Sequence, residues 1–332
     1  MINLSFFKSR QSLGWVVIVF FVTLVSCVSS PKVAPMDSDT SPSLFKIRFQ
    51  NMLGLEMYSA GCSMIADGGV ERMCQYSLKN PADLVFQVGP SFSPTQIEPI
   101  PSTERQSKRN ALWKSWEVQG VKFYSVDAFD LLPSLGEFLE SHQGSPILLL
   151  SSNLKNEKGE YLFTPSLSFT IKEKRIGILS FSEVRDLDKK NKVENIATAF
   201  SEVTKQMSDK VDVFYILGTL SRASRDAMTP LTSKPILFIG GELKEQNSID
   251  IEKQGTSFWI KAPDLGRGFG ELTVGDFKKD WKGRAPQATI GGLPHSFRSS
   301  ILKKGKVEFN SCSQILKTTK PQSLETEALE KK

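Results

Sequence analysis

The chain has 332 residues, enough for one large or two small domains, and its 39% hydrophobic and 23% charged residues exclude a disordered or collagen-like protein. Its two histidines, His142 and His295, exclude a metal centre built from several imidazoles of this chain alone. The formal net charge of +6 is concentrated in residues 277–332, with 12 Lys and Arg against 5 Asp and Glu, whereas residues 28–276 carry 28 against 31, which argues against a nucleic-acid partner.

The N-terminus has the pattern of a secretory signal. Lys8 and Arg10 precede an apolar run over residues 15–25, which is followed by the small residues Ser26 and Cys27. A run of about a dozen apolar residues is too short for a comfortable membrane span. The pattern therefore predicts an exported protein.

Leu24-Val25-Ser26-Cys27 resembles a bacterial lipobox. The resemblance implies that residues 1–27 are a lipoprotein signal peptide and that Cys27 is lipidated, which would hold the protein on the membrane of the bacterial cell envelope. Val28 in place of Asp favours the outer over the inner membrane. An uncleaved signal anchor with an incidental cysteine is the alternative.

Residues 28–43 are rich in Ser, Pro and Asp and lack apolar periodicity, which is typical of a flexible tether. Between residues 44 and 276, short apolar runs alternate with amphipathic segments. We predict strands at residues 45–50, 84–88, 121–126, 147–151, 167–171, 175–181, 211–217, 235–239, 257–262 and 268–274, and helices at 69–78, 133–140 and 193–208. Strands that are nearly all apolar and alternate with helices indicate an α/β layered sheet.

Residues 277–332 contain few apolar runs and many Lys, Ser and Thr, so we expect a basic C-terminal extension with a disordered end. Its lysines would either contact anionic lipid headgroups or remain solvated. His295 falls in this extension, and we expect it and His142 to be surface-loop or helix-terminus residues.

Five segments in order resemble the calcineurin-like metallophosphoesterase and 5′-nucleotidase superfamily. They are residues 152–165, which contain Ser152-Asn153 and Leu162-Phe163-Thr164-Pro165, and residues 174–181, 212–217, 239–241 and 266–274. The resemblance implies a metallophosphatase-like β-sandwich of mixed sheets flanked by helices, formed by one domain at residues 44–276 with flexible termini. It also implies the activity of a dinuclear phosphoesterase, if the metal ligands are present.

The ligand positions implied by the resemblance depart from the family pattern. Pro90 stands where the family has its bridging Asp, Val126 and Asp127 replace an Asn-His pair, and Thr219 replaces a histidine. Glu242 and Lys244 replace the two histidines of the family's Gly-Gly-His-x-His segment. Residues 51–54 lack the family's Asp-x-His. The resemblance therefore predicts a dinuclear metal site that has been lost, with no cofactor.

One alternative metal site uses oxygen ligands only. Asp127, Asp130 and Glu242 could gather at the strand ends and bind Ca²⁺ or Mg²⁺. Lys244 would oppose a divalent ion nearby, so a solvated loop or a surface ion pair between Glu242 and Lys244 is the competing interpretation.

Residues 61–72 resemble a Cys-Gly-Cys segment of envelope proteins in the same superfamily, but Ala60 replaces the first cysteine. Cys62 is thus a possible lone thiol. With Cys74 and Cys312 it could form a disulfide in more than one pairing, and buried free thiols are the alternative.

Three functions remain open from the sequence. The first is a lipid-anchored envelope protein with a metallophosphoesterase-like fold that has lost catalysis and binds or scaffolds an unidentified envelope protein or ligand. The second is a divergent phosphoesterase or 5′-nucleotidase-like hydrolase with Asp127, Asp130 and Glu242 as ligands. The third is a thiol protein that acts through Cys62.

Overall fold

The computed structural model describes residues 44–50, 69–92, 102–132, 134–183, 191–240, 251–261, 268–275 and 287–301, together with Gln314. All of them belong to one compact unit, residues 38–332. Within these ranges, no helix combines the length and the apolar character that a membrane span needs.

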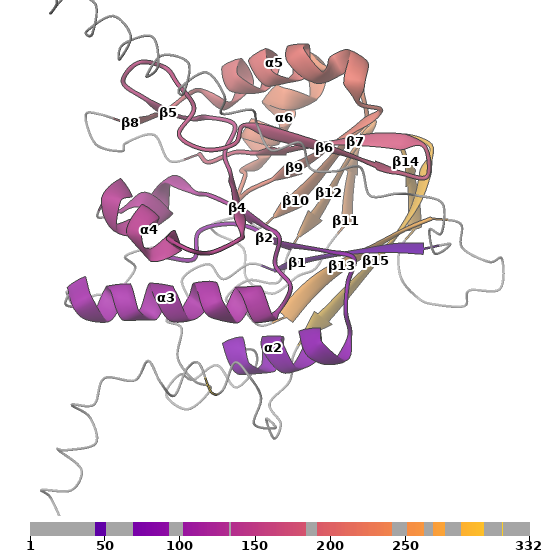
Figure 1. The fold of residues 1–332 in the computed structure, drawn as a ribbon. Coiled ribbons are helices and arrows are strands. Elements are labelled where there is room, and N and C mark those ends of the chain that lie inside the picture. Colours follow the sequence, from indigo (N-terminus) through magenta and orange to yellow (C-terminus); the bar gives the residue numbers. More distant parts are fainter. Residues whose placement is uncertain are drawn as a thin grey trace, which may run out of the picture. The chain divides into compact units, whose positions relative to one another are not determined.

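Two β-sheets form the centre of the unit (Figure 1). The seven-stranded sheet has the order β14-β15-β13-β1-β2-β3-β4, and the six-stranded sheet has the order β11-β12-β10-β9-β7-β6. Strands β1 to β4 run parallel, as do β7, β9, β10 and β12. The first sheet comprises β14 (Gln287–Ile290), β15 (Leu293–Ile301), β13 (Gly268–Gly275), β1 (Leu44–Gln50), β2 (Leu84–Gln87), β3 (Phe123–Ser125) and β4 (Leu148–Leu150). The second comprises β11 (Ile251–Gln254), β12 (Ser257–Lys261), β10 (Ile236–Gly240), β9 (Val213–Leu217), β7 (Lys174–Ser180) and β6 (Ser166–Ile171).

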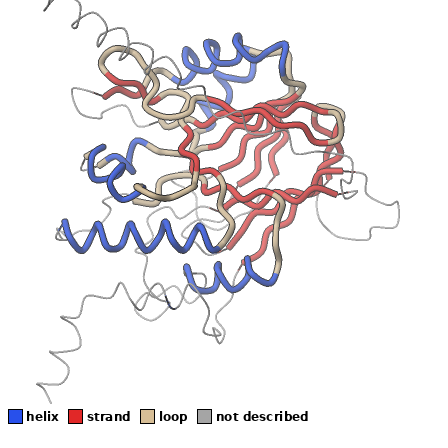
Figure 2. Tube along the Cα trace, viewed as in Figure 1, coloured by secondary structure: helices blue, strands red, loops and turns tan. Residues whose placement is uncertain are grey.

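The helices cover the outer faces of the two sheets, which gives four layers (Figure 2). Helices α2 (Val70–Lys79), α3 (Ser102–Val118) and α4 (Leu135–His142) pack on the seven-stranded sheet. Helices α5 (Ile196–Met207) and α6 (Arg222–Met228) pack on the six-stranded sheet. A short pair, β5 (Leu154–Asn156) and β8 (Asn191–Val193), follows β4 in a sheet of its own. Three 3₁₀ turns, η1 (Ala128–Leu131), η2 (Ser208–Lys210) and η3 (Thr229–Leu231), complete the described elements.

The period-2 alternation of β1 shows how the sequence divides between layers. Ile47 and Phe49 point into the core between the sheets, while Arg48 points to the helices and pairs with Glu271 of β13 at 2.7 Å between Nη2 and Oε1. The Arg48 guanidinium also stacks over the rings of Tyr76 and Phe269, each 4.9 Å away. Thus a fully buried charge under α2 is paired and packed on both sides.

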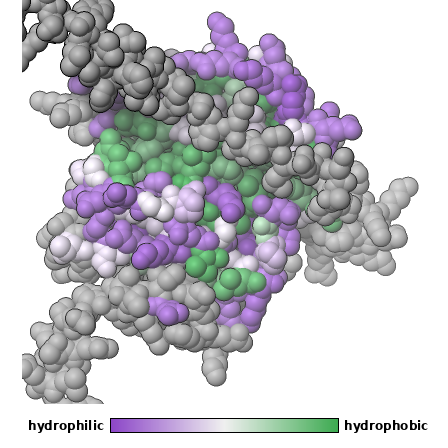
Figure 3. All heavy atoms as spheres, viewed as in Figure 1, coloured by the Kyte–Doolittle hydropathy of each residue, from purple (hydrophilic) through white to green (hydrophobic). Residues whose placement is uncertain are grey.

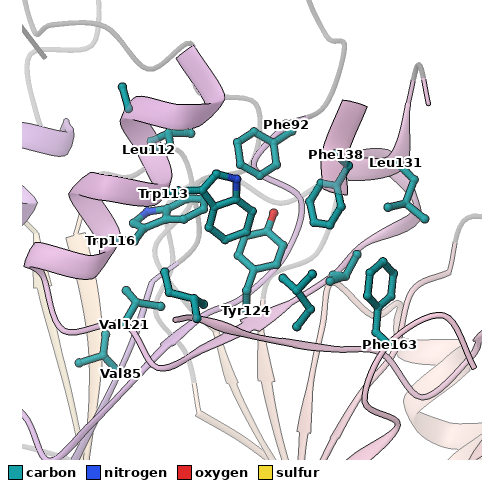
Figure 4. Close-up of a cluster of buried hydrophobic side chains, with 14 of the residues drawn as sticks. Val85, Phe92, Leu112, Trp113, Trp116, Val121, Tyr124, Leu131, Phe138 and Phe163 are labelled. Atoms are coloured by element: carbon teal, nitrogen blue, oxygen red, sulfur yellow. The ribbon is translucent and has the colours of Figure 1, made fainter. Parts of the chain in front are cut away.

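An aromatic cluster fixes α3 and α4 on the sheet (Figure 4). The indoles of Trp113 and Trp116 meet edge to face at 5.0 Å, and Tyr124 of β3 lies 5.0 Å and 5.3 Å from them. Phe92 and Phe138 complete the cluster, in which every ring is buried. Burial of each such side chain contributes roughly 1.5–3 kcal/mol to the free energy of folding, so these rings supply much of the energy that packs α3 and α4 on the sheet.

The ten predicted strands and three predicted helices are present, and no end is shifted by more than three residues. The sequence predicts that the domain ends at residue 276, but the seven-stranded sheet continues to Ile301. β15 pairs with β13 over seven residues, and β14 pairs with β15. The segment at 287–301 is therefore part of the sheet and not a solvated extension.

The expected surface position of His295 is wrong. His295 is fully buried on β15, where its Nε2 lies 2.6 Å from the hydroxyl of Tyr215 on β9. His142 is the last residue of α4, as expected, and its Nε2 lies 2.7 Å from the carbonyl oxygen of Ile147.

Candidate functional site

The parallel strands of both sheets end at the same side of the sandwich, which we call the carboxyl edge. The hydroxyls of Ser125, at the end of β3, and Ser180, at the end of β7, lie 2.6 Å apart. Ser152, which follows β4, donates its backbone N–H to the Ser180 carbonyl at 2.6 Å. The carboxyl edge therefore brings together residues from both sheets, the usual place for a binding site in an α/β fold.

Asp130 of η1 binds backbone at the carboxyl edge. Its Oδ1 accepts the N–H groups of Ser91 and Phe92 at 2.7 Å and 2.9 Å, and its Oδ2 accepts the N–H of Asp127 at 3.0 Å. Ser91 and Phe92 follow β2, so this fully buried carboxylate joins the β2 loop to η1. Both oxygens are occupied by charge-assisted hydrogen bonds within the protein.

Asp127 begins the same 3₁₀ turn. Its Oδ1 accepts the N–H of Phe129 at 3.0 Å, which together with Asp130 forms a capping box. The next N–H, that of Ala128, is donated to Ser182 Oγ at 3.0 Å. The two aspartates thus define the end of β3 and connect it to the segment after β7.

Burial changes the protonation of this pair. Burial, and next the nearby charge of Asp130, raise the pKa of Asp127 to about 7. Burial raises the pKa of Asp130 to about 6, against the opposing effect of its backbone hydrogen bonds. Burial and the Asp130 carboxylate also raise the pKa of Tyr124 well above its ordinary value. The site therefore holds two carboxyl groups that titrate near neutral pH.

Asn153 crosslinks the segments after β4 and β7. Its Nδ2 donates to the carbonyl oxygens of Ser182 and Glu194, at 2.7 Å and 3.2 Å, and its Oδ1 accepts the Ser182 N–H at 3.0 Å. The sequence marked Asn153 only through the family resemblance. Ser91 and Ser182 were missed, although a polar residue within three positions of the end of a predicted apolar strand was a visible signal for both.

The other predicted positions have different surroundings. Pro90 and Val126 are buried at the ends of β2 and β3, and neither side chain offers a ligand atom. Thr219, after β9, is buried, and its Oγ1 has no hydrogen-bond partner among the described residues. The same holds for both amide atoms of Gln50, the last residue of β1.

Close backbone contacts fill part of the carboxyl edge. A Cβ atom at Gly240 would overlap the carbonyl oxygen of Gly218, and a Cβ at Gly218, whose φ is +143°, would overlap the carbonyl oxygen of Phe181. Strands β7, β9 and β10 therefore end in direct backbone contact, which only glycine allows.

Within the described ranges, no three His, Cys, Asp or Glu side chains lie close enough together to hold a metal ion. These residues thus do not fit a dinuclear centre. Glu242 and Lys244 lie outside the described residues, as do Cys27 and Cys62. Cys74 of α2 is buried and disulfide-bonded, so it is not a free thiol, and its partner also lies outside the described residues.

Comparisons with known proteins identify the fold. Neither a protein-family model nor a curated protein matches the chain. Among solved structures, it resembles a 5′-nucleotidase precursor from Thermus thermophilus, with a TM-score of 0.61 and 12% identity over 86% of this chain and 60% of that one. It also resembles the calcineurin-like phosphoesterase YfkN from Bacillus subtilis, with a TM-score of 0.58 and 14% identity over 86% of this chain and 98% of that one.

A putative 5′-nucleotidase from Staphylococcus aureus aligns with a TM-score of 0.60 and 12% identity, over 83% of this chain and 58% of that one. The chain thus spans about 60% of the length of these two nucleotidases. At such low identity the similarity establishes the fold alone. The predicted metallophosphatase-like α/β sandwich is confirmed.

Proposed function

We propose that this protein is a lipid-anchored protein of the bacterial cell envelope in which a calcineurin-like phosphoesterase fold serves as a non-catalytic binding or scaffold module. One observation carries the proposal: Asp130, the fully buried carboxylate of the carboxyl edge, accepts three backbone N–H groups. Three of the roughly four lone-pair sites of this carboxylate are thus occupied by backbone N–H groups, which leaves Asp130 with little capacity to bind a metal or a substrate.

Metal content and hydrolysis test the loss of catalysis. The mature protein, purified from membranes, is analysed for bound transition metals and assayed with nucleoside 5′-monophosphates and p-nitrophenyl phosphate in the presence of Mn²⁺, Zn²⁺ or Mg²⁺. We expect no stoichiometric metal and no turnover above that of the buffer. Two tightly bound metal ions per chain with turnover would overturn the proposal.

The second candidate function is a divergent metal-dependent phosphoric ester hydrolase, and the raised pKa values of Asp127 and Asp130 favour it. Two buried carboxyl groups that titrate near neutral pH are typical of functional sites. In that case Asp127→Asn would abolish turnover while the exposed control Asp226→Asn retains it. Equal activity of both variants would exclude a catalytic Asp127.

The anchor rests on the sequence Leu24-Val25-Ser26-Cys27, and intact mass measurement tests it. Protein from a bacterial host is expected to begin at Cys27 and to carry diacylglycerol and acyl groups. Separation of inner and outer membranes tests the outer-membrane preference derived from Val28. A purified chain that keeps residues 1–26, or one without lipid, would refute the lipid anchor at Cys27. The proposal that the fold is non-catalytic would be unaffected by that result.

A further inference from the structure

Strand β6 is an edge strand of the six-stranded sheet, and within the described ranges it pairs only with β7. In β7, the backbone of Arg175 faces away from β6, because its N–H is donated to the carboxylate of Asp212 and its carbonyl oxygen accepts the Asp212 N–H. Thr170, which stands opposite Arg175, therefore directs its own N–H and C=O away from β7. Ser168 and Ser166 do the same at intervals of two residues, so β6 has an unpaired side.

The other edges of the two large sheets are shorter than β6 or already covered. β4 has three residues and is flanked by Thr164, which donates its N–H to Leu149 and accepts the N–H of Ser151. β14 has four residues, and so does β11, in which Glu252 and Lys253 are charged. Short or charged edge strands discourage pairing with a further strand. β6 has six residues, none of which is charged, so its edge is open to such pairing.

The seven-stranded sheet extends beyond β6. One row of inward-facing residues crosses four of its strands in register, and these residues are Phe49, Phe86, Phe123 and Leu148, from β1, β2, β3 and β4. Phe49 and Phe86 are fully buried, whereas Phe123 and Leu148 are half-buried. The six-stranded sheet thus stops covering this row after β2. We call Phe123 and Leu148 the apolar step.

β6 crosses the seven-stranded sheet diagonally. Near the end of β4, Ser152 Oγ donates to the carbonyl oxygen of Pro165, just before β6, at 2.5 Å. Near the start of β1, the rings of Phe45 and Phe169 are 6.4 Å apart. The starts of β3 and β4 therefore lie on the unpaired side of β6, whose inward side chains, Leu167 and Phe169, are half-buried on the same core as the apolar step. On the face shown in Figure 3, apolar surface is visible between the hydrophilic helical layers.

These features define what can occupy the site. The unpaired N–H and C=O groups of β6 require an extended backbone about 4.8 Å away, in the plane of the six-stranded sheet. Every second side chain of that backbone points to the apolar step on the facing sheet and must be apolar. A second copy of this chain does not fit through its own β6. A twofold axis would place its seven-stranded sheet in the space that holds Phe123 and Leu148.

We propose that the unpaired side of β6 is a docking site for an extended segment of a partner protein. The segment adds a seventh strand to the six-stranded sheet and packs apolar side chains, at alternate positions, on Phe123 and Leu148. The docking site names the partner class for the binding role proposed above and rests on that role. It does not use Asp127 or Asp130.

Peptide selection tests the docking site. The mature full-length protein is immobilised in detergent and incubated with a synthetic library of peptides of about eight residues, in which Leu, Ile, Val or Phe alternates with Ser or Thr. A control library has the same composition with the apolar residues consecutive. We expect the alternating library to be enriched about ten-fold or more over the control. Equal recovery of the two libraries, or no recovery of the alternating one, would overturn the proposal.

Two variants at Ser168 separate main-chain from side-chain effects. Ser168→Pro removes an N–H on the unpaired side and leaves the pairing of β6 with β7 intact, so it should weaken binding of the selected peptide by about ten-fold or more. Ser168→Ala should bind as the wild type does. Peptides N-methylated at one or the other alternate set of nitrogens repeat the test on the unchanged protein, and only one set should abolish binding. Equal binding of both variants, or of both methylated peptides, would refute strand addition.

Hydrogen exchange locates the bound peptide. Amides of residues 166–171 should exchange about ten-fold more slowly with peptide, whereas those of residues 251–254, on the opposite edge of the same sheet, should not change. Slowing at the opposite edge alone would contradict the assignment. Sedimentation of the peptide-free protein tests the other occupant, because a dimer that Ser168→Pro dissociates would identify a second copy instead.

The docking site and the proposed function can fail separately. A protein without bound metal or turnover that recovers no alternating peptide would refute the docking site and leave the non-catalytic role. Two bound metal ions with turnover would refute that role whatever the result with peptides.

Discussion

Tyr215 and His295 connect the two sheets through one buried hydrogen bond, and replacing both with Phe should remove a pH dependence of stability. His295 Nδ1 lies 2.7 Å from the carbonyl oxygen of Leu293, which can only accept, so Nδ1 carries the proton. Nε2 therefore accepts from the Tyr215 hydroxyl at 2.6 Å. This arrangement needs a neutral imidazole in a fully buried position.

The magnitude follows from linkage. Burial lowers the pKa of His295 from 6.5 to about 4, so the unfolded chain binds a proton that the folded protein does not. The stability that depends on neutral His295 is complete above pH 6.5 and is lost as the pH falls towards 4. The loss amounts to about 1 kcal/mol at pH 5.5 and about 2–3 kcal/mol at pH 4.5.

Urea unfolding of the wild type, Tyr215→Phe and Tyr215→Phe/His295→Phe at pH 7.5, 5.5 and 4.5 measures this effect. At pH 7.5 the single variant should lose about 1–3 kcal/mol, because His295 keeps a buried nitrogen without a donor. The double variant should recover part of this loss, since both side-chain polar groups are removed and only the Leu293 carbonyl oxygen loses its donor. It should also lack the share of the acid-induced loss that His295 causes. If the double variant loses as much stability between pH 7.5 and 4.5 as the wild type does, the buried neutral His295 is not its source.

Three further predictions concern the carboxyl edge and α2. Asp130→Ala should lower the free energy of unfolding by about 3 kcal/mol, because three buried backbone N–H groups lose their acceptor, and a urea midpoint equal to that of Asp226→Ala would contradict this role. The pKa of Asp127, raised to about 7, contributes to the free energy of unfolding fully below pH 4, and this contribution is lost as the pH rises through 7. Asp127→Asn should therefore flatten the dependence of the free energy of unfolding on pH between 4 and 7. An unchanged slope would contradict the burial of the Asp127–Asp130 pair. Reduction of the Cys74 disulfide should lower the melting temperature, and non-reducing peptide mapping should join Cys74 to Cys62 or Cys312; an unchanged melting temperature or a free Cys74 thiol would contradict this.

Most of the fold could be predicted because buried parallel strands leave a strong pattern. Val213–Leu217 and Ile236–Gly240 are buried at every position. Short apolar runs of this kind between helices indicate a parallel sheet that is covered on both faces. Helix α3 was not predicted, because most of its apolar residues fall in its second half, between Ala111 and Val118.

Strand β15 was not predicted for a different reason. Its inward positions, Leu293, His295 and Phe297, alternate correctly, but one of them is a histidine and Pro294 interrupts the run. The pairing with β13 supplies the main-chain hydrogen bonds, and Tyr215 supplies the polar partner that the imidazole needs. Neither of these two contacts is local in sequence, whereas the Gly291-Gly292 turn between β14 and β15 is a local hairpin signal that was missed.

The carboxyl edge shows why the residue types at a site do not decide its chemistry. Asp127 and Asp130 could be read from the sequence as oxygen ligands for a metal, and their spacing fits a capping box equally well. The two roles compete for the same lone pairs. Both oxygens of Asp130 accept backbone N–H groups. If these hydrogen bonds were broken, the loop after β2 would no longer be joined to η1. Two independent observations support the proposed non-catalytic role: the chain has only two histidines, and the buried carboxylate of Asp130 at the carboxyl edge accepts backbone N–H groups.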